Sequence, residues 1–309
     1  MVFLLHPDAA GTRVNGMEAL LASKKRIRSP VGAGIFYPED KQEILKVIKS
    51  LGLKAGINAL TRRTDGKAGG YAQAIIAPHG AWDYSGALAA DAFLSAMGRY
   101  DEIENVVVLG PIHDKRERGI FLSNSHFFST PLGNIPVNKR ITKELKLNSN
   151  LMEIDDIPHL GEHSIEILLP FIKYCFPAAS IIPVLMGQPN SEYIEDLSLS
   201  LKTVITPVLE KTLIVVSCNL SCDNDTVTAL YLAEECLRLF SQKDASALAK
   251  AILDGSINAC GGGLVVSLLE SGLLDGKHSF SAADYMVSAA GGSEDNDDDT
   301  VFYSALSFE

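Results

Sequence analysis

The chain has 309 residues, a formal net charge of −11, 47% hydrophobic residues and 21% charged residues. This composition is typical of a globular protein with a sizeable core, and one large domain accounts for the length. The acidic balance, without a stripe of Lys and Arg, argues against nucleic-acid binding, and no apolar stretch is long enough to span a membrane. Five scattered cysteines predict free thiols in a cytoplasmic protein rather than a disulfide framework.

The predicted elements begin after a variable lead-in. Residues 1–27 lack clear periodicity beyond a short helical stretch at Met17–Ser23, and we predict a single domain over residues 28–309. The domain opens with an irregular segment rich in Gly and Pro, Arg28–Pro38. Apolar residues at helical spacing after an acidic start then predict a helix over Glu39–Leu51.

Short, wholly apolar runs predict the buried strands of a sheet. These runs are Ala74–Ala77, Val106–Leu109, Ile181–Leu185 and Leu213–Val216. Helical patterns lie between and after them, at Ala87–Met97, Ile165–Tyr174, Ser191–Val204 and Thr226–Phe240. The alternation predicts an α/β fold in which a central, mostly parallel sheet carries helices on both faces.

Two further features interrupt this alternation. Phe121–Ser125 and Asn134–Val137, joined by a turn, are interpreted as an antiparallel excursion. Near the end of the chain, an acidic loop, Gly291–Asp299, precedes a predicted final strand, Val301–Phe308. The loop lacks the regular ligand spacing of an EF-hand, so we interpret it as a solvated loop rather than a calcium site.

Candidate metal ligands follow two of the predicted strands. His79 comes just after the first apolar run and His113 just after the second, and we expect these two runs to form neighbouring strands. Functional groups gather beyond the carboxyl ends of strands in open α/β sheets, and neutral imidazoles on rigid backbones suit a metal ion. Cys260, beside Gly261–Gly263, is a third candidate. Each residue taken singly also fits a structural role, so spacing leaves both interpretations open.

Several motifs, in order along the chain, resemble those of the Memo family. Ala77–Gly86 is similar to the family's APHAGxxYSG segment, with Gly80 and Ala81 transposed. Further resemblances are Arg28–Pro38 (ending in AGxFYP), Leu109–His113 (the GPSHH turn), Phe128–Gly133 (YxTPLG), Glu162–Pro170 (EHSIExHLP), Ile182–Gly187 (IPVLVG) and Ala259–Gly261 (CGR). The combination of motifs is specific, although no single one is.

The resemblance implies a fold shared with the class III extradiol ring-cleaving dioxygenases, which hold non-haem iron. The family's metal ligands fall on His79, His113 and Cys260, which implies a single metal ion, iron or copper, with zinc also compatible. Bacterial and archaeal members are called AmmeMemoRadiSam system protein B, which implies radical-SAM-linked partner proteins. The animal Memo protein is linked to phosphotyrosine-peptide binding, which implies a peptide or protein partner.

The chain departs from the family pattern around the expected pocket. The family's SSDFCHWG block reads Ser217-Cys-Asn-Leu-Ser-Cys-Asp-Asn, which places Asn219 at its Asp and Cys222 at its His. Asp114 stands at the second His of GPSHH, and Gly261 at the Arg after Cys260. The family's pocket His is an acid/base in the dioxygenases. A thiol, which titrates near 8.5 when unperturbed, cannot replace it.

Two pocket roles stay open at this point. His163, in the Glu162-His163-Ser164 motif, fits either a place in the pocket or simple capping of the following helix. Cys222 is either a wall residue or a fourth ligand. In the second case two imidazoles and two thiolates would form a closed tetrahedral set that favours zinc.

Three functions are compatible with these residues. The first is a metal-dependent oxidoreductase of dioxygenase type, the second a binding or redox metalloprotein, and the third a partner-binding module with an empty pocket. The retained set of His79, His113 and Cys260 argues against the third, and the changes at Asn219 and Cys222 argue against the first. We therefore favour a metal-binding protein without ring-cleaving activity.

Overall fold

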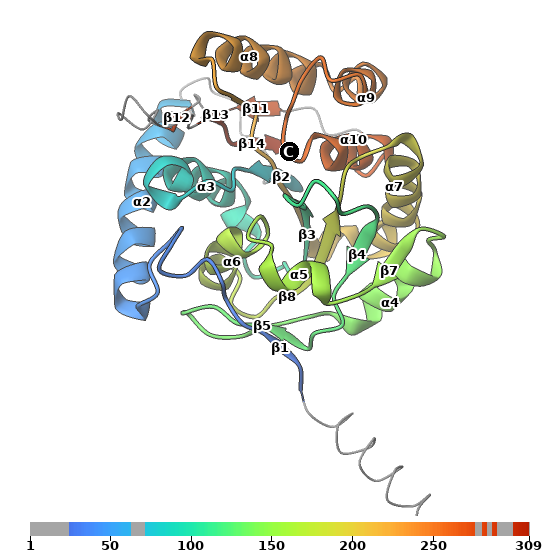
Figure 1. Cartoon of the computed structure of the whole chain (residues 1–309). Helices are drawn as coiled ribbons and strands as arrows, with labels where there is room; N and C mark the ends of the chain where they lie inside the picture. Colours follow the sequence, from blue (N-terminus) through green and yellow to red (C-terminus); the bar gives the residue numbers. More distant parts are fainter. Residues whose placement is uncertain (1–24, 63–71, 276–279, 283–285, 289–298, 309) are drawn as a thin grey trace, which may run out of the picture.

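A computed structural model describes residues 25–62, 72–275, 280–282, 286–288 and 299–308. Its centre is an eight-stranded sheet (Figure 1). In spatial order the strands are β11 (Phe280–Ala282), β14 (Leu306–Phe308), β2 (Ala74–Ala77), β9 (Thr212–Ser217), β3 (Asn105–Pro111), β8 (Ser180–Met186), β4 (Ile120–Leu122) and β7 (Met152–Ile154). The predicted α/β architecture around a central sheet is thus confirmed.

Parallel pairing is confined mainly to the middle of this sheet. The neighbours β2, β9, β3 and β8 are all parallel, whereas β14 runs antiparallel to β2 and β4 runs antiparallel to β8. The four central strands are the four apolar runs of the sequence, and every residue of β2, β3 and β9 is buried. Continuous burial follows from helices on both faces, which leave no polar side to a strand.

Alternate residues of each central strand belong to two hydrophobic clusters. Ile75 and Val108 face one cluster, with α2 (Lys41–Arg62), α3 (Trp82–Ala96) and α6 (Leu169–Cys175). Ile76 and Val107 face the other. The helices that supply that second cluster are α4 (Lys139–Leu147), α7 (Ser191–Ile205), α8 (Thr226–Gln242), α9 (Ala245–Leu253) and α10 (Gly262–Glu270). The prediction of helices on both faces is therefore confirmed.

Several predicted helices differ from the structure at their ends. The helix predicted over Ala87–Met97 begins earlier, at Trp82, and the one predicted over Glu39–Leu51 continues to Arg62. The pattern at Ile165–Tyr174 divides into a 3-10 turn, η3 (Glu166–Leu168), and α6, with a proline at the start of α6. Proline lacks the amide hydrogen needed inside a helix, so it marks this boundary.

The antiparallel excursion was predicted with the wrong partner. β6 (Ile135–Pro136) pairs with β5 (Phe127–Phe128), and the expected partner near Phe121 is β4 of the main sheet. β5 also pairs with β1 (Ile27–Arg28). The predicted final strand is interrupted between β13 (Thr300–Tyr303) and β14. β13 lies between β10 (Ser221–Asp223) and β12 (Met286–Val287) in a second three-stranded sheet.

The remaining elements are short. They are α5 (Ile157–Gly161), η2 (Met97–Arg99) and η4 (Thr206–Lys211). The helical stretch predicted at Met17–Ser23 and residues 291–298 of the acidic loop lie outside the described residues. Over the part of the chain that the structure describes, no helix is both long and apolar enough to cross a membrane.

A buried ion pair joins Arg28, near the start of the described chain, to Glu166 at the start of η3. The Arg28 guanidinium pairs with the Glu166 carboxylate and also donates to the carbonyl oxygens of His159 (2.9 Å) and Glu162 (2.7 Å). Glu166 further accepts a hydrogen bond from the Tyr37 hydroxyl at 2.7 Å. Because both charges have several hydrogen-bond partners, the cost of removing them from water is offset. The segment from the end of α5 to Glu166 is therefore held in place by Arg28.

Candidate metal centre

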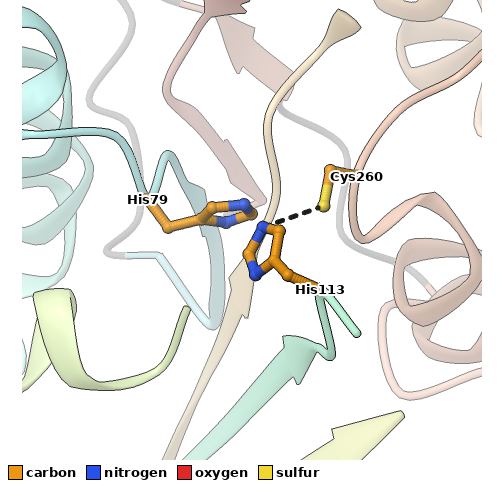
Figure 2. A group of neighbouring side chains, drawn as sticks. All are labelled: His79, His113 and Cys260. Atoms are coloured by element: carbon orange, nitrogen blue, oxygen red, sulfur yellow. Dashed lines mark hydrogen bonds between the residues drawn. The ribbon is translucent and has the colours of Figure 1, made fainter. Parts of the chain in front are cut away.

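His79 and His113 lie just beyond the carboxyl ends of β2 and β3, at the same edge of the sheet. We expected these two strands to be neighbours, but β9 lies between them. Cys260 comes from the turn before α10. Figure 2 shows the two imidazole rings and the sulfur facing one another, and their ligand atoms all lie within 4.8 Å of one another. Three distant segments thus meet at one point.

The His79 ring is held by a chain of hydrogen bonds. Its Nδ1 lies 2.7 Å from Ser217 Oγ, and that hydroxyl donates its hydrogen to the Ser164 carbonyl oxygen, also at 2.7 Å. With its hydrogen used, the Ser217 oxygen accepts from Nδ1–H, which leaves the lone pair on His79 Nε2. Burial, followed by the nearby His113 and His163, lowers the pKa of His79 well below its usual value. The ring is therefore neutral, as a metal ligand must be.

His79 Nε2 is the atom that points to a ligand. It is buried and has no hydrogen-bond partner among the described residues. An unpaired buried polar atom is costly, and in native proteins it calls for an explanation such as a bound ion. Two further ligand atoms, His113 Nε2 and Cys260 Sγ, lie beside this nitrogen and 3.5 Å from each other. A cation among the three atoms would satisfy all of them.

His113 is oriented by the carboxylate of Glu162. Glu162 Oε1 lies 2.9 Å from His113 Nδ1, and Oε2 accepts from the His113 backbone N–H at 2.8 Å. Burial opposes a charge on His113, but hydrogen bonds to Cys260 and Glu162 outweigh it and raise its pKa to about 10. Burial likewise opposes the charge on Glu162, whose hydrogen bond to His113 lowers its pKa to about 2. A carboxylate on the far nitrogen is the usual support of a metal-bound histidine.

One short turn, residues 162–164, supports both histidines. Glu162 holds His113 directly, while the Ser164 carbonyl oxygen holds His79 through Ser217. The Ser164 hydroxyl donates to the Pro111 carbonyl oxygen at 2.7 Å, which ties the turn to the end of β3. The relative positions of the two imidazoles therefore depend on this turn.

Asn219 fixes the backbone of two candidate ligands. Its Oδ1 accepts from the His79 backbone N–H at 3.0 Å, and its own N–H donates to the Cys260 carbonyl oxygen at 3.0 Å. The residue after Cys260, Gly261, has a positive φ of 101°, and a Cβ there would lie 2.3 Å from the Ser217 carbonyl oxygen. Only glycine fits this conformation without strain, so Gly261 is required for the turn that presents Cys260.

The other predicted pocket residues divide into two kinds. The His163 ring lies in the site, stacked between Phe36 (centroids 4.6 Å apart) and His113 (4.4 Å). Asp114 instead forms an ion pair with Arg116 at the surface, at 2.7 Å. The Cys222 thiol donates to Asp299 Oδ2 at 3.3 Å and belongs to neither group of converging ligand atoms among the described residues. Its role as a fourth ligand stays a prediction.

A second group of possible ligands consists of His113, Glu162 and His163. Glu162 Oε1, however, already accepts from the backbone N–H groups of His163 (2.8 Å) and Ser164 (2.7 Å) in addition to His113. Of the two roles that the sequence left open for this motif, His163 lies in the pocket, whereas η3 and α6 have no side-chain cap. Because Glu162 Oε1 is already engaged by these donors, we interpret Glu162 as a support for the ligand His113 and not as a ligand of a second ion.

Ser217 and Ser164 are site residues that the sequence reasoning missed as such. Ser217 is the first polar residue after the fourth apolar run, so it lies at the same sheet edge as the histidines. That position is the only local signal. Its hydrogen bonds to residues 138 and 53 positions away have no trace in the spacing of the sequence.

The fold and the site define an α/β protein with two histidines and one cysteine converging at the carboxyl edge of its parallel strands. Comparison with known proteins agrees with the resemblance seen in the motifs. The family described as "Memo-like protein" matches residues 28–307, and the chain belongs to this family.

Curated relatives cover most of the chain. A "MEMO1 family protein" of Thermotoga neapolitana is 31% identical over 255 residues, which is 80% of this chain and 88% of the relative. One of Thermotoga maritima is 30% identical over 249 residues, 78% and 87% of the two chains. One of Methanobrevibacter smithii is 27% identical over 264 residues, 85% and 93% of the two.

Proposed function

We propose that this protein binds a single metal ion through His79 Nε2, His113 Nε2 and Cys260 Sγ, and that the site has a binding or redox role. The observation that carries the proposal is the buried, unpaired Nε2 of His79, facing the other two ligand atoms within 4.8 Å. Ser217 and Glu162 occupy the opposite nitrogens of the two rings, so both Nε2 atoms are directed inward.

The donor set narrows the identity of the metal. Two imidazoles and a thiolate suit iron, copper or zinc, whereas magnesium and calcium prefer oxygen ligands. Three protein ligands leave a coordination position open, which is typical of sites that bind an exogenous molecule. The ion would act there as a Lewis acid or redox centre. The protein's contribution is to hold the imidazoles in one tautomer and to keep the thiol accessible.

Two residues favour a role other than ring cleavage. The Cys222 side chain stands where the family has an acid/base histidine, and its thiol is already hydrogen-bonded to Asp299. Asn219 Oδ1 is committed to the His79 backbone N–H. Neither side chain is arranged to transfer a proton to or from a substrate, which acid/base catalysis requires.

Elemental analysis of protein purified without chelators tests the proposal. We expect close to one iron, copper or zinc per chain, and loss of that metal in Cys260→Ser. Reconstitution with cobalt(II) gives a second readout, because a thiolate ligand produces a charge-transfer band that Cys260→Ser should abolish. Cys175→Ser is the matched control, since this thiol lies in α6, outside the group of ligands. A cobalt spectrum identical in wild type and Cys260→Ser would overturn the site.

A further inference from the structure

An apolar cavity lies apart from the metal centre, between α2, α3 and α6. Its volume is about 460 Å³, within the range of pockets that enclose small-molecule ligands. The inner wall is built from buried apolar side chains, chiefly Ile48, Ala90, Phe93 and Phe171. We propose that this cavity binds a long-chain monocarboxylate, with the alkyl chain inside and the carboxylate on Lys49 at the rim.

The shape of the cavity depends on a glycine inside a helix. Gly52 lies on α2 and lines the cavity, and a Cβ added to it would meet nothing within 4 Å. Glycine in a helix interior costs about 1 kcal/mol relative to alanine, yet here no neighbour requires it. Because Gly52 lines the cavity, a side chain at this position would occupy part of its volume. An apolar chain of the right length would gain the contacts that the empty volume lacks.

The rim supplies the argument for a carboxylate. Exposed Lys49 stands at the mouth together with the half-exposed ring of Tyr174 and the side chain of Leu94. No carboxylate partner of Lys49 is present among the described side chains. The positive charge of Lys49 beside an apolar cavity favours an anionic head group over a cationic one. An apolar wall with one lysine at its rim fits a ligand that has an alkyl chain and one carboxylate.

An aromatic ring on the wall of the cavity contacts a second ring beyond it. The Phe171 ring, on the cavity wall, packs against Trp82, with ring centroids 4.5 Å apart. Trp82 in turn donates from Nε1 to the Ile167 carbonyl oxygen at 3.2 Å. No lining residue of the cavity belongs to the group of metal ligands, so the two sites can be tested with separate variants.

Calorimetric titration of the full-length protein with dodecanoate tests the proposal. We expect saturable binding of one molecule per chain, with affinity falling about fourfold for each methylene removed. Gly52→Met places a side chain in the cavity and should weaken binding at least tenfold. Ser50→Met is the matched control, because this exposed residue lies on the same helix but does not line the cavity.

The head group is tested with dodecanol and a second pair of variants. Lys49→Gln should weaken dodecanoate binding without affecting dodecanol, whereas Lys46→Gln, an exposed lysine of the same helix that does not line the cavity, should change neither. Equal dodecanoate affinity in wild type and Gly52→Met would overturn the cavity as the site. If Lys49→Gln weakened the binding of dodecanoate and dodecanol equally, the proposed contact between Lys49 and a carboxylate would be wrong. Metal content should be unchanged in all these variants.

Discussion

Ser217 Oγ lies 2.7 Å from His79 Nδ1 and, through its own hydrogen, 2.7 Å from the Ser164 carbonyl oxygen. This serine is fully buried at the end of β9, the strand that separates β2 from β3. It therefore fixes the tautomer of one candidate ligand from the strand between the two histidines. The same serine connects that ligand to the turn that holds the other.

Ser217→Ala should weaken metal binding about tenfold or more, because His79 loses the acceptor that directs its free lone pair inward. The variant also leaves His79 Nδ1 and the Ser164 carbonyl oxygen unpaired in a buried site, which should cost about 1–3 kcal/mol of the free energy of unfolding. Competition with a chromogenic chelator and urea unfolding measure the two effects. Ser221→Ala, a buried serine that bonds Ala229 instead, is the control. Equal metal affinity in the two variants would contradict the role of Ser217.

Glu162→Gln should lower metal affinity about 10- to 100-fold. The carboxylate accepts from His113 Nδ1 and three backbone N–H groups, and an amide would place an NH2 group against some of these donors. Metal affinity and the cobalt spectrum measure the effect, and Glu153→Gln, an exposed carboxylate of β7, is the control. Unchanged affinity would show that His113 does not need this support.

Cys222→Ser should leave zinc affinity within about twofold of wild type, because the Cys222 thiol is directed to Asp299 in the structure. The alternative, a closed set of two histidines and two cysteines, requires a large loss of zinc affinity on removing one thiolate. Zinc titration of wild type and variant decides between them. A loss of tenfold or more would establish Cys222 as the fourth ligand, and Cys222→His should then raise affinity for ferrous iron.

Catechol ring cleavage should be absent. The family histidine expected to act as acid/base is Cys222 here, and the thiol cannot take over that role at its position. Protein loaded anaerobically with ferrous iron is exposed to oxygen and a panel of catechols, and ring-opened product is followed by absorbance. Turnover at an enzymatic rate, lost in His113→Ala, would prove this prediction wrong.

His159 should make the protein less stable as the pH falls from about 6.5 to 4. Burial lowers the pKa of His159 to about 4, whereas the unfolded chain titrates near 6.5. Between these values the unfolded state binds a proton that the folded state does not, so stability is lost with decreasing pH. The contribution of this residue is about 3 kcal/mol over the full window.

The His159→Gln variant isolates the contribution of His159 to the pH dependence. Glutamine keeps a donor for the Phe121 carbonyl oxygen, which lies 3.2 Å from His159 Nε2, but has no proton to gain. Urea unfolding at pH 7 and pH 4.5 should show that wild type loses about 2–3 kcal/mol more than the variant. Parallel losses in the two proteins would mean that another group is responsible.

The sequence by itself determined the central strands and the place of the two histidines. Apolar runs at Ala74–Ala77 and Leu213–Val216 can only be buried, and a residue that follows such a run lies at the edge of the sheet. Helix ends and the pairing of short strands were less well predicted, because a strand such as β6, two residues long, carries no period of its own. Local chemistry thus specifies the elements more closely than their partners.

Only the tertiary structure decided how these residues combine into a site. That β9 lies between β2 and β3 depends on how helices pack over the sheet, and no local pattern encodes strand order. The hydrogen bonds of Ser217 to His79 and of Glu162 to His113 join residues 138 and 49 positions apart. Such bonds form because the folded chain excludes water and brings buried polar groups together, each of which then needs a partner.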